Sequence, residues 1–263
     1  MNPDLSNEEN QPNIKRPLIE KGKGLWNADL LIFSTLDSTN KWGLDNFDSC
    51  QHGTVIWTLA QTAGYGRHRR QWVTHENKGL AFSIILKNLP EAPVAMLAGL
   101  AVQSALSEFE LKARLKWPND IMLNEKKVAG ILAETPPEKN GVIVGIGVNV
   151  NTTSEDLASI ELLQPATSMF IESQKTYDLC VVLGVILQKF GNVWEQIKNT
   201  EALVSKWQKF DFLEGKNVSV KTETGEFMGT YQGIDSDGKL ILKTPDGESV
   251  SFYSGDVVVV QLK

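Results

Sequence analysis

The stretch LKWPNDIMLNEKKVAGILAE, residues 115–134, decides how the centre of the chain folds. It predicts one strand that ends just before Pro118 and a second that begins at Lys127 after a hairpin. Because proline cannot occupy a central ladder position, Asn119 and Asp120 are expected to project from a strand end. Polar groups at a strand end commonly face a ligand crevice, so the same stretch predicts part of a binding site.

Lys127 has two interpretations. A lysine that enters a buried strand is costly unless an anion compensates its charge. The alternative is an exposed hairpin lysine, like the neighbouring Lys126. These residues alone leave both interpretations open.

The sequence around this stretch alternates strand-like and helix-like runs. Apolar and alternating runs predict strands over residues 29–36, 54–60, 79–87, 113–117, 127–134 and 141–150. Helical spacing of apolar residues predicts helices over residues 94–110 and 177–198. The pattern predicts a mixed α/β domain over residues 26–213.

The two ends of the chain differ from this middle part. After residue 214, short strand-like runs are separated by the turn signals TETGE, DSDGK and TPDGE, which predict hairpins and a small β-barrel domain over residues 214–263. Residues 1–25 lack apolar periodicity and contain three prolines, which predicts a flexible tail.

Composition limits the possible partners. The 263 residues include 26 Lys and Arg against 32 Asp and Glu, a formal charge of −6, which argues against a broad electrostatic grip on nucleic acid or an anionic membrane. No apolar stretch approaches the roughly 20 residues of a spanning helix, and no signal peptide is recognisable, so a cytoplasmic location is expected. The two cysteines have no CxxC spacing, and metal ligands stay unassigned.

A local cationic site is predicted by AQTAGYGRHRRQW, residues 60–72. It is not a P-loop, because the sequence has no GxxxxGK followed by Ser or Thr. It is not a GxGxxG motif either, because Arg69 stands where the third glycine would be. Gly64 and Gly66 would let the backbone approach a ligand, and the arginines would supply charge-assisted hydrogen bonds to phosphate oxygens. The alternative is a solvated turn.

A third motif, STLDSTNKW over residues 34–42, places Ser38, Thr39 and Asn40 where a strand leads into a helix. Such residues usually cap helices. A helix N-terminus with free N–H groups can also receive a carboxylate or a polar ring, and the two roles are compatible.

In this order, DSTN, QTAGYGRHRRQW, KWPND, KVAG and GIGVNVN resemble the biotin protein ligases, also called biotin–acetyl-CoA-carboxylase ligases, from about Leu30 to the C-terminus. The resemblance implies a catalytic domain similar to class II synthetases and a C-terminal domain similar to a Src-homology-3 barrel. Family members with repressor activity carry an N-terminal DNA-binding domain. Fewer than 30 residues precede the first strand here, so the chain resembles the ligase-only form and DNA is not expected as a partner.

The resemblance implies a two-step reaction that uses ATP and biotin as substrates and usually needs Mg²⁺. Biotin is activated as biotinyl-5'-AMP and is then transferred to a lysine of a biotin carboxyl carrier protein. A homodimer is a family expectation. The alternatives are a lipoate or octanoyl transferase of related fold, whose RRxSGGG stretch is absent, and a binding module formed by residues 214–263.

The resemblance also implies roles for individual residues. The catalytic candidates are Arg67 and Lys127. The candidates for contact with biotin are these two residues together with Ser38, Thr39, Asn40, Gln61, Gly64, Tyr65 and Gly66. The candidates for the nucleotide side are Trp72, Trp117, Asn119 and Asn149.

The arginine loop departs from the family pattern GRGRxGRxW. Tyr65 replaces an arginine and Arg69 replaces a glycine. Loss of the glycine restricts the backbone, and either Arg69 or His68 is expected to supply the missing cation.

Overall fold

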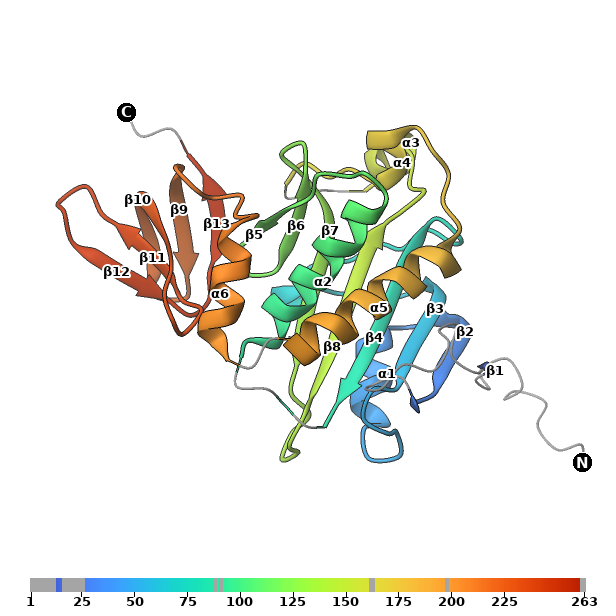
Figure 1. Ribbon diagram of the computed structural model, residues 1–263. Coiled ribbons are helices and arrows are strands. Elements are labelled where there is room, and N and C mark those ends of the chain that lie inside the picture. Colours follow the sequence, from blue (N-terminus) through green and yellow to red (C-terminus); the bar gives the residue numbers. More distant parts are fainter. Residues whose placement is uncertain are drawn as a thin grey trace, which may run out of the picture.

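The computed structural model describes residues 13–15, 27–87, 89, 92–160, 164–196 and 199–260. Its strands form an eight-stranded sheet with the order β1-β2-β3-β4-β8-β7-β6-β5 and a five-stranded sheet with the order β12-β11-β10-β9-β13. Figure 1 shows the second sheet beside the β5 end of the first.

The large sheet is mixed. Its strands are β1 (Asn13–Lys15), β2 (Leu30–Leu36), β3 (Val55–Gln61), β4 (Gly79–Leu86), β5 (Arg114–Lys116), β6 (Asp120–Leu123), β7 (Lys126–Glu134) and β8 (Val142–Asn149). The pair β2–β3 is parallel, and the other neighbouring strands are antiparallel. The predicted strands are present, and the sequence analysis missed β1 and β6.

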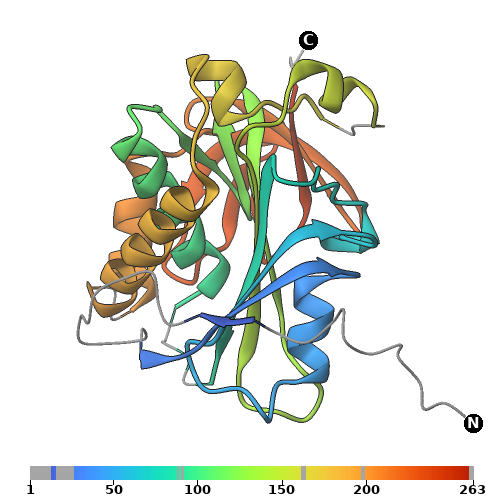
Figure 2. The same ribbon diagram turned by 90° about the vertical axis from the view of Figure 1, so that its right-hand side faces the viewer.

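Helices cover both faces of this sheet. The long helices α2 (Val94–Glu108) and α5 (Leu179–Gln196) lie on one face, and α1 (Thr39–Asp45) lies on the other, as Figure 2 shows. Successive side chains of a strand point to opposite faces. Phe82 of β4 therefore packs in the core under α2 and α5, whereas Ile85 packs in the smaller core near α1.

Shorter helices complete the domain built on the large sheet. They are the 3₁₀ helix η2 (Arg67–Arg69), α3 (Ser154–Ala158), α4 (Met169–Ser173) and α6 (Thr200–Gln208). In the part of the chain that the structure describes, no helix combines the length and apolar character needed to cross a membrane.

The C-terminal sheet is antiparallel throughout. Its strands are β9 (Asn217–Thr222), β10 (Gly225–Ile234), β11 (Leu240–Lys243), β12 (Ser249–Phe252) and β13 (Asp256–Val259). Its apolar residues belong to the same cluster as the core under α2 and α5, so the two domains share one hydrophobic core. The expected fold class, a mixed α/β domain followed by a small β-domain similar to a Src-homology-3 fold, is confirmed.

The expected domain boundaries at 25/26 and 213/214 stay predictions. Within the range expected to be a flexible tail, β1 pairs with β2, and residues 1–12 and 16–25 lie outside the described residues.

Candidate active site

A row of small residues forms the floor of a cavity on the α1 face of the large sheet. Strand pairing aligns Ala81 of β4 with Gly147 of β8, Gly147 with Gly130 of β7, and Gly130 with Asp120 of β6. Directly paired residues share one face of a sheet. The floor is therefore almost free of side chains at its centre and ends in a carboxylate.

The glycines of β8 are required by the side chains that lie over them. A Cβ atom on Gly145 would lie 2.2 Å from Oδ1 of Asn40, and one on Gly147 would lie 2.2 Å from Cε2 of Trp72. Gly130 is less crowded, because its Cβ would lie 3.1 Å from the side chain of Lys127. The motif GIGVNVN thus makes space for the walls of the cavity.

One end of the cavity is a buried, uncharged hydrogen-bond network. The hydroxyl of Ser83 lies 2.7 Å from both Thr39 Oγ1 and Asn40 Oδ1, and the backbone N–H of Thr39 donates to Gln61 Oε1 at 3.0 Å. Ser38 is 3% exposed and caps α1 by accepting from the N–H of Lys41. These contacts fix the orientation of the groups expected to meet biotin.

Asn40 differs from its neighbours because its amide is already used. Its Nδ2 atom lies 2.8 Å from Glu134 Oε2 and 3.3 Å from the carbonyl of Leu132, while its Oδ1 accepts from Ser83. Asn40 is therefore well placed to hold α1 against β7, and the half-buried Gln61 is the more accessible candidate for ligand contact.

The arginine loop lies across the cavity as a short bridged turn. Tyr65 and Gln71 form an isolated β-bridge around η2. Gly64 cannot carry a side chain, because its Cβ would lie 2.4 Å from the carbonyl of Trp72 and 2.5 Å from Gln61 Nε2. Gly66 has more space, since its nearest contact would be at 3.8 Å.

The two departures from the family loop are coupled. Arg69 has a φ angle of 57°, the left-handed conformation that glycine favours and that costs other residues about 1–2 kcal/mol. Its guanidinium lies 4.3 Å above the ring of Tyr65, and the Tyr65 hydroxyl donates to Glu134 at 3.0 Å. Burial, followed by the charge of Glu134, raises the pKa of Tyr65 above its ordinary value, so the phenol stays protonated. A tyrosine anchor with a stacked arginine thus stands where the family has an arginine and a glycine.

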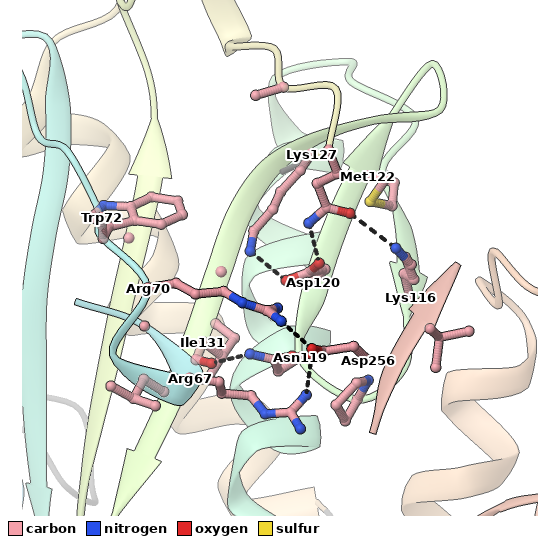
Figure 3. Close-up of a pocket in the computed structure, with 18 of the residues that line it drawn as sticks. Arg67, Arg70, Trp72, Lys116, Asn119, Asp120, Met122, Lys127, Ile131 and Asp256 are labelled. Atoms are coloured by element: carbon pink, nitrogen blue, oxygen red, sulfur yellow. Dashed lines mark hydrogen bonds and ion pairs between the residues drawn. The ribbon is translucent and has the colours of Figure 1, made fainter. Parts of the chain in front are cut away.

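The C-terminal domain holds the loop through a residue that the sequence analysis missed. Arg67 donates to the carbonyl of Gly255 at 3.1 Å and lies 4.0 Å from the carboxylate of Asp256, which also pairs with Arg70 (Figure 3). Burial lowers the pKa of Arg67, and Asp256 opposes that shift. Asp256 could not be found from a motif, because it is 186 residues from Arg70 in the sequence.

Lys127 lies inside the cavity, which excludes the surface interpretation. Its Nζ atom is 2.6 Å from Asp120 Oδ1 and 5.5 Å from the centre of the Trp72 ring, and its side chain is 21% exposed. The other Asp120 oxygen accepts from Gln164 Nε2 at 2.7 Å. Figure 3 shows Lys127 and the two arginines directed toward the same space.

The other nucleotide-side candidates use their polar groups within the protein. Asn119 Nδ2 donates to the carbonyl of Ile131 at 2.6 Å, and Asn149 Nδ2 donates to that of Thr167 at 3.0 Å. Trp117 is 1% exposed, and its indole donates to the carbonyl of Gly238 in the C-terminal domain at 3.0 Å. These three residues line the cavity as supports, whereas Trp72 forms a wall.

The cavity has a volume of about 900 Å³ and is lined by both domains. One end offers neutral hydrogen-bonding groups, and the other offers ammonium and guanidinium groups. Across the described ranges, no group of three or more His, Cys, Asp or Glu side chains could hold a metal ion. The arrangement suits an elongated ligand that has a polar ring at one end and phosphates at the other.

Comparison with known proteins agrees with this geometry. Residues 31–151 match the biotin/lipoate A/B protein ligase family, and residues 215–260 match the biotin protein ligase C-terminal domain. The chain is 34% identical to the bifunctional ligase/repressor BirA of Bacillus subtilis over 87% of this chain and 73% of that protein. It is 32% identical to the biotin–[acetyl-CoA-carboxylase] ligase of Paracoccus denitrificans over 83% of this chain and 96% of that protein. A solved structure of the Aquifex aeolicus biotin protein ligase in complex with biotin and ATP matches with a TM-score of 0.77 at 28% identity, covering 89% of this chain and 99% of that chain.

The fold and the site define a protein of the biotin and lipoate ligase class. The matched C-terminal domain and the relatives distinguish the biotin ligases from the lipoate ligases within this class. The chain belongs to the biotin protein ligase family. The resemblance expected from the sequence motifs is confirmed.

Proposed function

We propose that this protein activates biotin with ATP to give biotinyl-5'-AMP and pyrophosphate, and then transfers the biotinyl group to a lysine of a biotin carboxyl carrier protein. The observation that carries this proposal is the cavity itself, in which a neutral polar end and a cationic end share one glycine floor. The relatives support the same activity, since they are biotin ligases and one was solved with biotin and ATP.

In the first step, the biotin carboxylate attacks the α-phosphorus of ATP, and the bond to the leaving pyrophosphate breaks. Two anions must approach each other, so fixed cations are needed near the reacting atoms. Lys127 and Arg67 are the residues that supply them. Both are held in the resting site by carboxylates, Asp120 and Asp256, from which a phosphate ligand would recruit them.

In the second step, the acceptor amine attacks the carbonyl carbon of the mixed anhydride, AMP leaves, and the attacking nitrogen loses a proton. This step requires no nucleophile from the protein. The chain has to hold the adenylate and exclude water from it. The arginine loop, fastened to the sheet by Tyr65 and to the C-terminal domain by Arg67 and Arg70, is the part suited to that task.

Ligand recognition is assigned to the neutral end. Thr39, Gln61 and Ser38 form a preorganised set of donors and acceptors for the ureido ring of biotin. Buried polar groups of this kind reject an analogue that cannot pair with them. Backbone groups of Gly64, Tyr65 and Gly66 lie beside this set, and Trp72 covers the junction with the nucleotide.

Several properties belong to the proposal and rest on general chemistry. Mg²⁺ is proposed to enter with ATP as its phosphate counterion. The formal charge of −6 supports the absence of DNA as a partner. A homodimer and a cytoplasmic location are carried over from the family resemblance and from ATP as a substrate.

The alternatives explain less. A lipoate or octanoyl transferase is not favoured, because the relatives that match both domains are biotin ligases. A separate binding module in residues 214–263 does not account for Asp256, which reaches into the same cavity as Lys127.

Exchange of labelled pyrophosphate into ATP tests the proposal. The purified protein with Mg²⁺ is expected to exchange only when biotin is present, and then to label a carrier domain. Exchange driven equally well by lipoate would refute it.

A further inference from the structure

Lys116 extends the pocket row by one strand beyond Asp120. It is the direct cross-strand partner of Asp120 in the β5–β6 pair, so both side chains lie on the pocket face. From β8 to β5 the row crosses three strand spacings of roughly 5 Å each. Lys116 therefore lies at the end of the cavity farthest from the Ser83 network, beyond Lys127 on β7.

The surroundings of Lys116 differ from those of the other cations that line the cavity. Lys127, Arg67, Arg70 and Lys216 each have a carboxylate within 4.0 Å. Within the described ranges Lys116 has none, and its Nζ atom donates to the neutral Oε1 of Gln164 at 2.9 Å.

The neighbouring carboxylate of Asp120 is engaged by two other donors. One oxygen of Asp120 accepts from Lys127, as Figure 3 shows, and the other accepts from Gln164. Gln164 thus bridges Asp120 and Lys116 and holds the ammonium in the cavity without neutralising it. Burial lowers the pKa of Lys116, which expresses the cost of keeping a cation there, and the charge of Asp120 opposes that shift only in part.

We propose that Lys116 binds the β- and γ-phosphates of ATP and holds the pyrophosphate as it leaves. This inference rests on the proposed function and adds a second cation for the same reaction. Lys127 serves the carboxylate and α-phosphate, whereas Lys116 serves the leaving group. Gln164 is a positioning residue, since it orients the ammonium and leaves the charge available to the ligand.

The test compares Lys116→Gln with Lys116→Arg and with Lys126→Gln, an exposed lysine of the nearby hairpin. A charge-assisted hydrogen bond contributes about 1.5–3 kcal/mol, so Lys116→Gln is expected to raise the KM for pyrophosphate and for ATP about 10- to 100-fold. The KM for biotin and inhibition by AMP should change less than about twofold, because neither ligand carries β- or γ-phosphates. Lys116→Arg should restore most of the affinity, and Lys126→Gln should behave as wild type.

A general structural role would instead reduce the affinities for biotin, AMP and pyrophosphate together, and that result would overturn the inference. An unchanged KM for pyrophosphate in a folded Lys116→Gln protein would also overturn the inference. If wild type shows no biotin-dependent exchange, the proposed function fails first, and the two failures are distinguishable.

A measurement on the unaltered protein keeps the inference testable if the variant does not fold. Lys116 is acylated with an amine reagent, and the modified peptide is quantified by mass spectrometry. Inorganic pyrophosphate should protect Lys116 and leave Lys126 reactive, whereas biotin alone should not protect it. Equal labelling of Lys116 with and without pyrophosphate would contradict the assignment.

Discussion

Gly147→Ala tests whether the glycine floor positions Trp72. The added Cβ would lie 2.2 Å from Cε2 and 2.5 Å from both Cζ2 and Nε1 of the indole, whereas ordinary contacts begin at 3.4 Å. Either the ring or the strand must therefore move by more than an ångström. Because β8 is paired on both sides by β4 and β7, the loop that carries Trp72 is the part that gives way.

Overpacking of this kind costs about 1–3 kcal/mol. If the cost falls on the position of the loop described here, in which Trp72 lies over Gly147, the Kd for biotin should rise about 5- to 150-fold. Since the loop moves and the sheet does not, the thermal midpoint should change by less than about 3 °C. Calorimetric titration with biotin measures the Kd. Indole fluorescence followed during heating measures the thermal midpoint.

Gly184→Ala is the matched control, because a Cβ there meets nothing within 4 Å on the helix α5. That variant should bind biotin as wild type does and should be more stable by about 0.5–1 kcal/mol. The reasoning would be refuted if Gly147→Ala kept wild-type affinity, or if both variants lost affinity equally.

Three further predictions concern the same site and its support. Lys127→Ala should lower the rate of adenylation, measured by pyrophosphate exchange, about 10²- to 10³-fold. Lys126→Ala should leave this rate unchanged. A folded Lys127→Ala protein with normal exchange would contradict a role of Lys127 in adenylation. Tyr65→Phe removes the hydroxyl that donates to Glu134, so the adenylate should escape about tenfold faster. Escaped adenylate is measured as labelling of a bystander protein that lacks a carrier domain. Bystander labelling equal to that of wild type would contradict the role of Tyr65 as an anchor of the loop. A hydrogen bond from the Lys78 side chain lowers the pKa of Asp156 from 3.8 to about 2, so its contribution to stability is complete above pH 3.8 and is lost as the pH falls through about 2. In urea unfolding, Asp156→Asn should be less stable than wild type at pH 5 and approach it near pH 2, and a constant difference over that range would exclude the linkage.

Much of the fold was predictable from the sequence because strand and helix periods are local properties. The strands near residues 30–36, 55–61 and 142–149 and the helix at 94–108 follow from the spacing of apolar side chains. β6 was missed because four residues between a proline and a hairpin carry too short a pattern. β1 was missed because its three residues also carry too short a pattern.

The site was predictable in its parts and not in its connections. The motifs located Lys127 and the arginine loop because charged side chains next to glycines or a strand start are unusual locally. Which groups remain available to a ligand depends on partners distant in the sequence. Asn40 donates to Glu134, 94 residues away, and this contact could not be read from the stretch STLDSTNKW.

By itself, the sequence determined the α/β class, the order of the two domains, and the presence of a glycine- and arginine-rich loop followed by a lysine at a strand start. Only the tertiary structure decided that Gly145 and Gly147 make room for Asn40 and Trp72, that Asp256 closes the loop from the other domain, and that Lys116 has no carboxylate within 4.0 Å among the described residues. The physical reason is that strand register, which brings together residues far apart in the chain, is set by the packing of the whole sheet.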